Sequence, residues 1–292
     1  MILNSLDVKA RAKINLMLDV LGPRGDGYNN IRTIMQTISL CDDVTVSLSD
    51  VIGIRIHCDF EGIPLGPDNL AYKAAFKMMH VADEKASGLG VDVSINKRIP
   101  MAAGLAGGSA DAAAVIVALN KMLRTNLDDD IMRNIATSIG ADVPFCLRGG
   151  TMFAEGVGNI LTALPSPPKG LIVALATPPI AVSTSTVFEA LNINEERPIP
   201  SPDAIRRGLA AGDVYQIAEG MANVLENVTV QWYPVIAAVK DIFMRYGAIS
   251  AIMSGSGPSI FAIFKGEERA REAIGQVEEK VRNVRCFLTE FE

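Results

Sequence analysis

The sequence predicts an α+β fold with two lobes. Strands and helices are expected in runs along the chain, not in the strict alternation that builds a parallel α/β sheet. With 292 residues, the chain is about twice as long as a typical domain. A proline-rich stretch at residues 161–170 shifts the composition and predicts a surface connection. We expect an N-terminal lobe over about residues 1–155 and a C-terminal lobe over about residues 156–292.

The N-terminal half is expected to begin with strands. Residues 10–20 alternate with period two, so that one face is apolar while the other carries Lys13 and Asn15. The glycine-rich turn at residues 22–27 ends this strand. Further strands of this half are expected at residues 44–48, 52–58 and 91–95.

Helical patterns follow the strands in both halves. Residues 69–84 place Leu70, Ala74 and Met78 at spacings of four, and an alanine-rich helix is expected from Ser109 to Leu123. Further helices are expected at residues 128–139, 202–211, 214–225, 233–246 and 267–283, and further strands at residues 171–176, 248–253 and 260–264.

The composition excludes several classes of protein. Hydrophobic residues make up 49% of the chain and charged residues 21%, which is ordinary for a globular protein. The 27 basic and 33 acidic residues give a net charge of −6, without a basic stripe. This balance argues against a dedicated nucleic-acid binder, whose affinity depends on neutralising phosphates. A small anionic ligand stays open, because it needs only a local site.

Cysteine and histidine usage argues against a zinc site. The four cysteines are scattered and form no C-x-x-C pair: Cys41, Cys58, Cys146 and Cys286. The only histidines are His57 and His80, so catalysis by a Cys–His or Ser–His–Asp set is poorly supported. We expect reduced, buried thiols.

The mean hydropathy of +0.26 raises the question of a membrane segment. The best candidate, residues 246–264, carries no charge but contains Gly, Ser and Pro in its middle. Such a break favours a strand, a turn and a second element in a core over a spanning helix. The N-terminus does not resemble a signal peptide. We expect a cytoplasmic protein with no membrane partner.

The stretch at residues 100–113 is the strongest candidate for chemistry. Three glycines precede Ser109 and an alanine-rich helix, and glycines together with a helix N-terminus can bind an anion such as phosphate. Ser109 would either cap the helix or offer its hydroxyl to a phosphate or a magnesium ion. A tight turn with a serine cap and no ligand is the alternative. The pattern is neither G-x-x-x-x-G-K-[ST] nor G-x-G-x-x-G.

Other candidates also have two interpretations. Asp142, in an apolar turn, either caps that turn or accepts a proton from a substrate hydroxyl. Lys13 and Asn15 lie on a solvated strand face, or Lys13 stabilises developing charge. The glycine turn at residues 254–258 fits a hairpin as well as a ligand site. Tyr28 either packs at the periphery or stacks on a flat base.

In this order along nearly the whole chain, these pieces resemble the GHMP small-molecule kinases. The resemblance is to the branch that phosphorylates 4-diphosphocytidyl-2-C-methyl-D-erythritol on the non-mevalonate route to isoprenoids. The motifs that carry it are K-x-N-L at 13–16, R-x-D-G-Y at 24–28, P-x-x-x-G-L-x-G-G-S-x-x-A-A at 100–113, G-A-D-V-P-F at 140–145, F-A-E-G-x-G at 153–158 and the glycine turn at 254–257.

The resemblance implies a role for each matching residue. Asp142 would activate the acceptor hydroxyl, and Lys13 would hold the Asp142 carboxylate ionised. Asn15 would help to position the acceptor. Tyr28 and Phe188 would sandwich the cytosine ring, next to Asn29, which stands where the branch usually has His. Residues matching the adenosine and phosphate positions are Asn69, Lys97, Pro100, Met101, Ala102, Ala103, Gly104, Leu105, Ala106, Gly107, Gly108, Ser109 and Ala110. Ser109 would lie near Mg²⁺.

The expected protein is therefore an ATP-dependent alcohol kinase with its site in the cleft between two lobes. Its partners would be small-molecule substrates, with ATP and Mg²⁺ and without nucleic acid, membrane or an evident protein partner. The alternatives are a kinase of another branch, of homoserine or mevalonate type, and a non-catalytic nucleotide-binding paralogue. Tyr28 and Phe188 argue against the first alternative, and intact Lys13 and Asp142 argue against the second.

Overall fold

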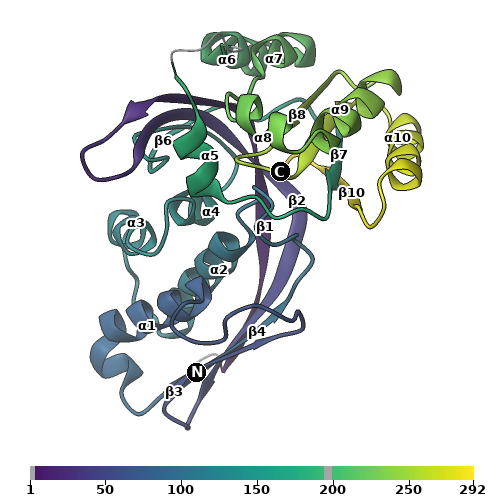
Figure 1. Cartoon of the computed structure of the whole chain (residues 1–292). Coiled ribbons are helices and arrows are strands. Elements are labelled where there is room, and N and C mark those ends of the chain that lie inside the picture. Colours follow the sequence, from purple (N-terminus) through teal and green to yellow (C-terminus); the bar gives the residue numbers. More distant parts are fainter. Residues whose placement is uncertain (1–3, 194–198) are drawn as a thin grey trace. The chain divides into compact units, whose positions relative to one another are not determined.

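The computed structural model describes residues 4–193 and 199–292 (Figure 1). Its contacts divide the chain into two compact units that share long strands. Unit 1 comprises the residues up to Ala12, Cys41–Ile99 and Ala106–Arg148, and unit 2 comprises Lys13–Leu40, Pro100–Leu105 and the residues from Gly149 onward. The units therefore interleave along the sequence, and a single boundary near residue 155 stays a prediction.

Unit 1 contains a sheet built on the ends of two long strands. β1 (Ser5–Pro23) pairs with β2 (Asn29–Ser49), and both strands contribute residues to both units. In unit 1, β2 pairs antiparallel with β4 (Gly90–Asn96), and β4 pairs parallel with β3 (Gly53–Cys58). A parallel pair needs a crossover connection, which here contains a helix. The predicted strands at 10–20, 44–48, 52–58 and 91–95 are confirmed.

Unit 1 has several helices, some of them rich in alanine. They are α1 (Leu70–Ala82), the short 3₁₀ helix η1 (Asp83–Ala86), α2 (Gly107–Met122), α3 (Asp129–Thr137) and α4 (Val143–Arg148). α1 and α2 lie side by side (Figure 1). Small buried side chains, including Ala71, Ala74 and Ala75 on α1, allow the two backbones to approach closely.

In unit 2, the first half of β2 pairs with a hairpin that the sequence did not predict. β2 pairs antiparallel with β5 (Thr151–Glu155), which pairs with β6 (Ile160–Ala163). The expected connection at 161–170 is therefore wrong for its first three residues, which belong to a strand.

The second sheet of unit 2 is antiparallel throughout, in the order β10-β7-β9-β8. Its strands are β7 (Ile172–Thr177), β8 (Ser250–Met253), β9 (Ile260–Phe264) and β10 (Arg285–Glu290). α9 (Val235–Arg245) and α10 (Glu267–Lys280) pack on it, with Phe243 and Phe264 edge to face at 6.2 Å. The uncharged stretch at 246–264 is thus strand, turn and strand, as predicted.

The remaining helices of unit 2 are α5 (Thr184–Ala190), α6 (Pro202–Ala211), α7 (Val214–Gly220) and α8 (Glu226–Trp232). The predicted helix at 214–225 ends early, at Gly220, and α8 was not predicted. No helix among the described residues is long and apolar enough to cross a membrane. The four cysteines are free, as expected, but only partly buried. The α+β class is confirmed.

Candidate functional site

Lys13 and Asn15 are held in a buried chain of hydrogen bonds in unit 2. The Lys13 ammonium donates to Asn15 Oδ1 at 2.7 Å, and Asn15 Nδ2 donates to Thr33 Oγ1 at 2.8 Å. Thr33 Oγ1 in turn donates to the carbonyl of Met17 at 2.6 Å. Lys13 is 5% exposed and Asn15 2%, so the interpretation of their strand face as solvated is wrong. Both faces of β1 are buried here, and this series of hydrogen bonds sets the direction of the Lys13 ammonium.

The backbone of Lys13 is tied to the first part of the glycine stretch. Its N–H donates to the carbonyl of Leu105 at 3.1 Å, and both residues belong to unit 2. Residues Pro100, Met101, Ala102, Ala103, Gly104 and Leu105 of the predicted nucleotide loop lie in unit 2, whereas Ala106, Gly107, Gly108, Ser109 and Ala110 lie in unit 1. Lys13 is therefore hydrogen-bonded directly to the first part of the loop, within unit 2.

The two glycine segments that the sequence singled out touch each other in unit 2. The hydroxyl of Ser254 donates to the carbonyl of Gly104 at 2.8 Å, and the Ser259 N–H donates to the carbonyl of Ala103 at 3.3 Å. Gly104 has φ +76°, and a Cβ there would lie 2.0 Å from the Ser254 carbonyl oxygen. Only glycine satisfies both conditions. Segments about 150 residues apart thus form one structure.

Asn223 holds the second glycine turn and was missed by sequence reasoning. Its side-chain amide donates to the carbonyls of Met253 at 2.8 Å and Gly255 at 2.7 Å, and the residue is 2% exposed. Thr184 and Ser256 share a further hydrogen bond of 2.8 Å between their hydroxyls. The sequence signal for Asn223 was a polar residue in an apolar segment, which does not reveal a partner so distant in the chain.

Tyr28 projects from a turn that its neighbours make rigid. The Arg24 guanidinium pairs with the Asp26 carboxylate at 3.0 Å, and the Asp26 carboxylate accepts the Tyr28 N–H at 3.2 Å. Hydrogen bonding from Arg24 holds the pKa of Asp26 below its usual range. Tyr28 is 62% exposed. Asn29, the next residue, begins β2 and is partly buried.

Phe188, on α5 of the same unit, is only partly buried. It packs against the apolar core beneath the antiparallel sheet. A partly buried aromatic residue that packs on a core is suited to serve as a stacking platform.

In unit 1, α2 begins without a side-chain cap. Its N-cap residue is Ala106, in the left-handed region at φ +58°, and the helix starts at Gly107. Ser109 therefore lies in the first turn, partly exposed, and the alternative in which it caps the helix is wrong. The unpaired N–H groups of an uncapped first turn suit an anion. A strained alanine at such a place is typical of functional backbone.

Lys97 occupies a buried ionic cluster in unit 1. Its ammonium pairs with the carboxylates of Asp42 and, at 2.8 Å, of Asp111. The side chains of Lys97, Asp42 and Asp111 are 4%, 0% and 6% exposed. Burial raises the pKa of Asp111 to about 7, against the opposing charge of Lys97. For Lys97, burial lowers the pKa, but the two carboxylates outweigh it and the pKa is raised. The ammonium thus faces carboxylates inside the unit.

Asn69 has a structural role at the start of α1. Its Oδ1 accepts the Ala71 N–H at 2.8 Å as the N-cap, and its Nδ2 donates to the Pro64 carbonyl at 2.8 Å. Both contacts fix the Asn69 side chain at the N-terminus of α1. A contact to adenosine is compatible with the remaining hydrogen-bonding capacity of the amide and stays a prediction.

Asp142 immediately precedes the short helix α4 in unit 1. It is partly exposed, and its carbonyl accepts the Cys146 N–H at 3.0 Å. The backbone of Asp142 thus starts the helix, and both interpretations of its carboxylate stay predictions. In the contact division, Asp142 lies in unit 1 and Lys13 in unit 2.

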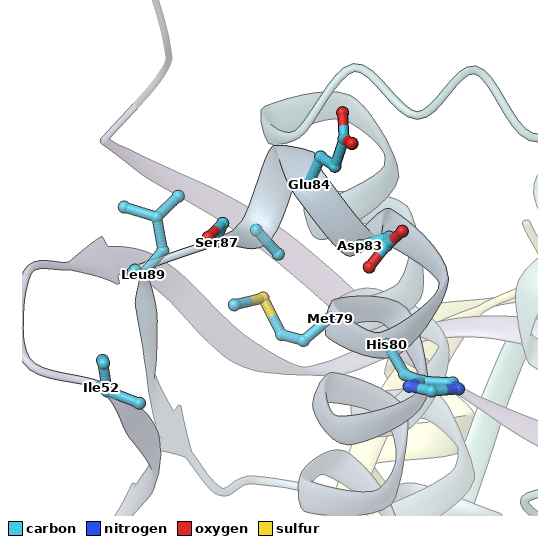
Figure 2. A pocket seen from close by; sticks show the side chains of 9 residues that line it. Ile52, Met79, His80, Asp83, Glu84, Ser87 and Leu89 are labelled. Carbon is cyan, nitrogen blue, oxygen red and sulfur yellow. The ribbon is translucent and has the colours of Figure 1, made fainter.

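The residues that the structure describes contain no ready-made group of metal ligands. Among residues 4–193 and 199–292, no group of three or more His, Cys, Asp or Glu could hold a metal ion. A surface cavity of about 600 Å³ in unit 1 is lined elsewhere, by the end of α1, η1 and the loop before β3 (Figure 2). Met79 extends from α1 toward Ile52 and Leu89, and His80, Asp83 and Glu84 also line the cavity (Figure 2).

Comparisons with known proteins agree with the motif resemblance. The family model described as "GHMP kinases N terminal domain" matches residues 52–150, and "GHMP kinases C terminal" matches residues 205–283. A 4-diphosphocytidyl-2-C-methyl-D-erythritol kinase from Acetivibrio thermocellus is 43% identical over 288 residues, covering 99% of each chain. One from Geobacter metallireducens is 44% identical and covers 93% of each chain.

Solved structures give the same result. A crystal structure of 4-(cytidine 5'-diphospho)-2C-methyl-D-erythritol kinase matches with a TM-score of 0.80 and 31% identity, over 98% of this chain and 99% of that one. A homoserine kinase from Cytophaga hutchinsonii matches with a TM-score of 0.79 over 99% and 95% of the two chains. At 20% identity, that second likeness concerns the fold alone.

Proposed function

The chain belongs to the GHMP kinase family, and we propose that it transfers the γ-phosphoryl group of ATP to the 2-hydroxyl of 4-diphosphocytidyl-2-C-methyl-D-erythritol. It is a kinase with an alcohol as acceptor and ATP as co-substrate, as its relatives' names indicate. The geometric observation that carries the assignment is the hydrogen bond from the Lys13 backbone N–H to the Leu105 carbonyl. It joins the proposed catalytic lysine to the proposed nucleotide loop.

Asp142 and Lys13 are the proposed catalytic residues. The Asp142 carboxylate accepts the proton of the acceptor hydroxyl, whose oxygen then forms a bond to the γ-phosphorus while the bond to the β–γ bridging oxygen breaks and ADP leaves. Lys13 keeps Asp142 ionised and stabilises charge on the reacting oxygens. Phosphoryl transfer depends mostly on positioning and charge stabilisation, so a carboxylate and an oriented ammonium suffice on the protein side. The chain from Lys13 through Asn15 to Thr33 supplies that orientation.

The glycine loop is the proposed site for the phosphates of ATP. Support comes from the uncapped first turn of α2, with Gly107, Gly108 and Ser109, and from the close packing of Gly104 on the second glycine turn. Asn69 and Lys97 would contribute to the adenosine end. Because the Lys97 side chain is 4% exposed while the residue as a whole is partly exposed, its main chain is the part open to a ligand.

Mg²⁺ is proposed to enter with the nucleotide. The described residues contain no cluster of metal ligands, which fits an ion held mainly by phosphate oxygens and water. The Ser109 hydroxyl, in the first turn of α2, suits one remaining position. When bound, the ion would neutralise phosphate charge.

The acceptor's cytosine is proposed to lie between Tyr28 and Phe188. Tyr28 is exposed on a turn fixed by Arg24 and Asp26, and Phe188 is supported by the core. Asn29 would meet the edge of the base, and Asn15 would help to hold the acceptor alcohol. A kinase that uses ATP and a nucleotide-linked substrate is proposed to work in the cytoplasm.

An acceptor panel tests the assignment. Purified protein with ATP and Mg²⁺ is given the cytidine-linked erythritol, homoserine or mevalonate, and ADP release is measured. We expect rapid release only with the cytidine-linked alcohol. Faster turnover of homoserine or mevalonate would move the chain to another branch. Nucleotide binding without turnover of any acceptor would indicate a non-catalytic paralogue.

A further inference from the structure

Three buried charged residues join the two ends of the glycine loop in unit 1. Asp42 lies on β2, Lys97 precedes the loop and Asp111 lies on α2, just after it. The Lys97 ammonium contacts both carboxylates. None of the three side chains is more than 6% exposed, so the cluster is internal to the unit.

Asp42 fixes the segment that enters the loop. Its Oδ1 accepts two consecutive backbone N–H groups, from Arg98 at 2.6 Å and from Ile99 at 2.8 Å, and its Oδ2 accepts the Lys97 ammonium. These are the last residues before Pro100. One fully buried carboxylate therefore sets the direction in which the backbone enters the loop.

Asp111 ties the segment that leaves the loop to the same lysine. Its Oδ2 accepts the Lys97 ammonium at 2.8 Å from the start of α2. A Cβ on Gly107 would lie 3.2 Å from Lys97 Nζ and 3.1 Å from Ile99 Cγ2. Gly107, the first residue of α2, thus packs directly on the segment that enters the loop. The Lys97 ammonium lies beside Gly107 and contacts Asp111.

The composition of the cluster is not what stability alone would favour. It places two carboxylates around one ammonium, and Asp111 Oδ1 is buried without a hydrogen-bond partner. Buried ionic groups often stabilise a protein no more than apolar residues of similar volume would. Holding a defined backbone geometry is a better explanation for this arrangement.

We propose that Asp42 and Asp111 are positioning residues for ATP: through Lys97, they hold both ends of the glycine loop in the geometry that binds the phosphates. The inference rests on the proposed function, in which this loop binds ATP. The Lys97 ammonium then serves the loop and not the nucleotide. Losing the contacts of Lys97 with these carboxylates weakens ATP binding, while the acceptor site and the reacting groups are unaffected.

Asp111→Ala tests the proposal against Asp111→Asn, with Asp43→Asn as the matched control. Asp111→Ala removes one of the two carboxylates that accept the Lys97 ammonium, the one on α2. Asp111→Asn keeps an oxygen in that place and removes only the excess negative charge. Asp43 is the neighbouring carboxylate, 31% exposed, and its ion pairs with Lys9 and Arg98 lie outside the cluster. We measure the Kd of ATP by calorimetry, both KM values, kcat and Tm.

We expect Asp111→Ala to raise the Kd and the KM for ATP about 2- to 30-fold, the range of coupling through residues that do not touch the ligand. The KM for the acceptor should stay unchanged. Asp111→Asn should restore most of the ATP affinity, and Asp43→Asn should match the wild type.

A folded Asp111→Ala protein with wild-type ATP affinity would overturn the proposal, as would an equal loss in Asp43→Asn. If Asp111→Ala does not fold, Asp111→Ser, whose hydroxyl is too short for the contact with Lys97, is judged by the same criteria. Wild-type protein that binds ATP but phosphorylates no acceptor would refute the proposed function alone. The ratio of ATP affinities between variant and wild type would still decide the role of Asp111.

Discussion

Two buried lysines in this molecule have different partners. Lys13, in unit 2, donates to the neutral amide of Asn15, which is anchored on Thr33. Lys97, in unit 1, lies between the carboxylates of Asp42 and Asp111. An ammonium oriented by a fixed amide is suited to act on a reacting group, whereas one enclosed by two carboxylates is suited to hold backbone segments together. Burial alone therefore does not tell a catalytic lysine from a structural one.

The largest effect is expected for Asp142→Asn, which removes the proposed catalytic carboxylate. Loss of a positioned general base lowers kcat by about 10²- to 10⁴-fold. ATP affinity should stay close to the wild-type value, because the phosphates are assigned to the glycine loop. Steady-state kinetics and calorimetry with ATP measure the two quantities. If ATP binding falls as steeply as turnover, Asp142 is structural or anchors the metal.

Lys97→Met should reveal the other kind of lysine through stability. It leaves two carboxylates buried without their cation, and breaking a buried ion pair from one side costs about 3–5 kcal/mol in the free energy of unfolding. Urea denaturation measures this loss. Adding Asp111→Asn to the same protein should recover part of it, because one charge fewer is left unpaired. Equal stabilities of Lys97→Met and the wild type would mean that the cluster does not carry charge inside the fold.

Tyr28→Ala concerns a residue outside both lysine networks, so it should affect acceptor binding only. Stacking on one aromatic ring is worth about 1–3 kcal/mol, so the KM for the cytidine-linked acceptor should rise about 5- to 150-fold. Turnover at saturation should change less, because the base contributes mainly uniform binding. Initial rates over a range of acceptor concentrations check this. An unaltered KM would contradict the cytosine sandwich but not membership of the family.

Asn29→His should have the smallest effect. If Asn29 meets cytosine through its backbone, replacing it with the residue usual in the branch leaves the acceptor KM within about 2-fold of the wild-type value, since no side-chain contact is exchanged. The same initial-rate assay is the measurement. A large fall in KM would show that a histidine ring improves recognition and that Asn29 reads the base through its side chain.

Local patterns predicted elements well where the pattern and the burial agree. The alternation at 10–20 identified the core of β1, and residues 202–211 and 260–264 form the predicted helix and strand with the predicted bounds. The solvated face of β1 was mistaken, because period two shows which residues share a face and not what covers it. The first half of β2, with Asn30, Arg32 and Gln36 among its residues, lacks a clear apolar alternation, and its pairing with β5 is long-range.

The site was predicted as a set of residues, whereas its connections were not. The glycine stretch was recognisable from residue types and spacing, and Lys13 and Asn15 were recognisable only through the family motifs. Thr33, Asn223 and Asp42 were not, because each acts through a partner 18 to 55 positions away. Ser109 looked like a helix cap, yet the backbone takes a left-handed turn at Ala106 and starts the helix earlier. Such contacts depend on tertiary packing and leave no periodic signal.

The central claim is that Lys13 acts in phosphoryl transfer, whereas Lys97 holds the glycine loop that binds ATP. A single-turnover measurement on Lys13→Met tests this claim most directly. ATP and the cytidine-linked acceptor are both saturating, product formation is followed by rapid quench, and the Kd of ATP is determined on the same protein. The account predicts that phosphoryl transfer slows by at least about 10²-fold, the loss typical of a preorganised charge at the reacting atoms, with an unchanged Kd. A transfer rate within a few-fold of the wild type, or a Kd that rises as much as the rate falls, would contradict it.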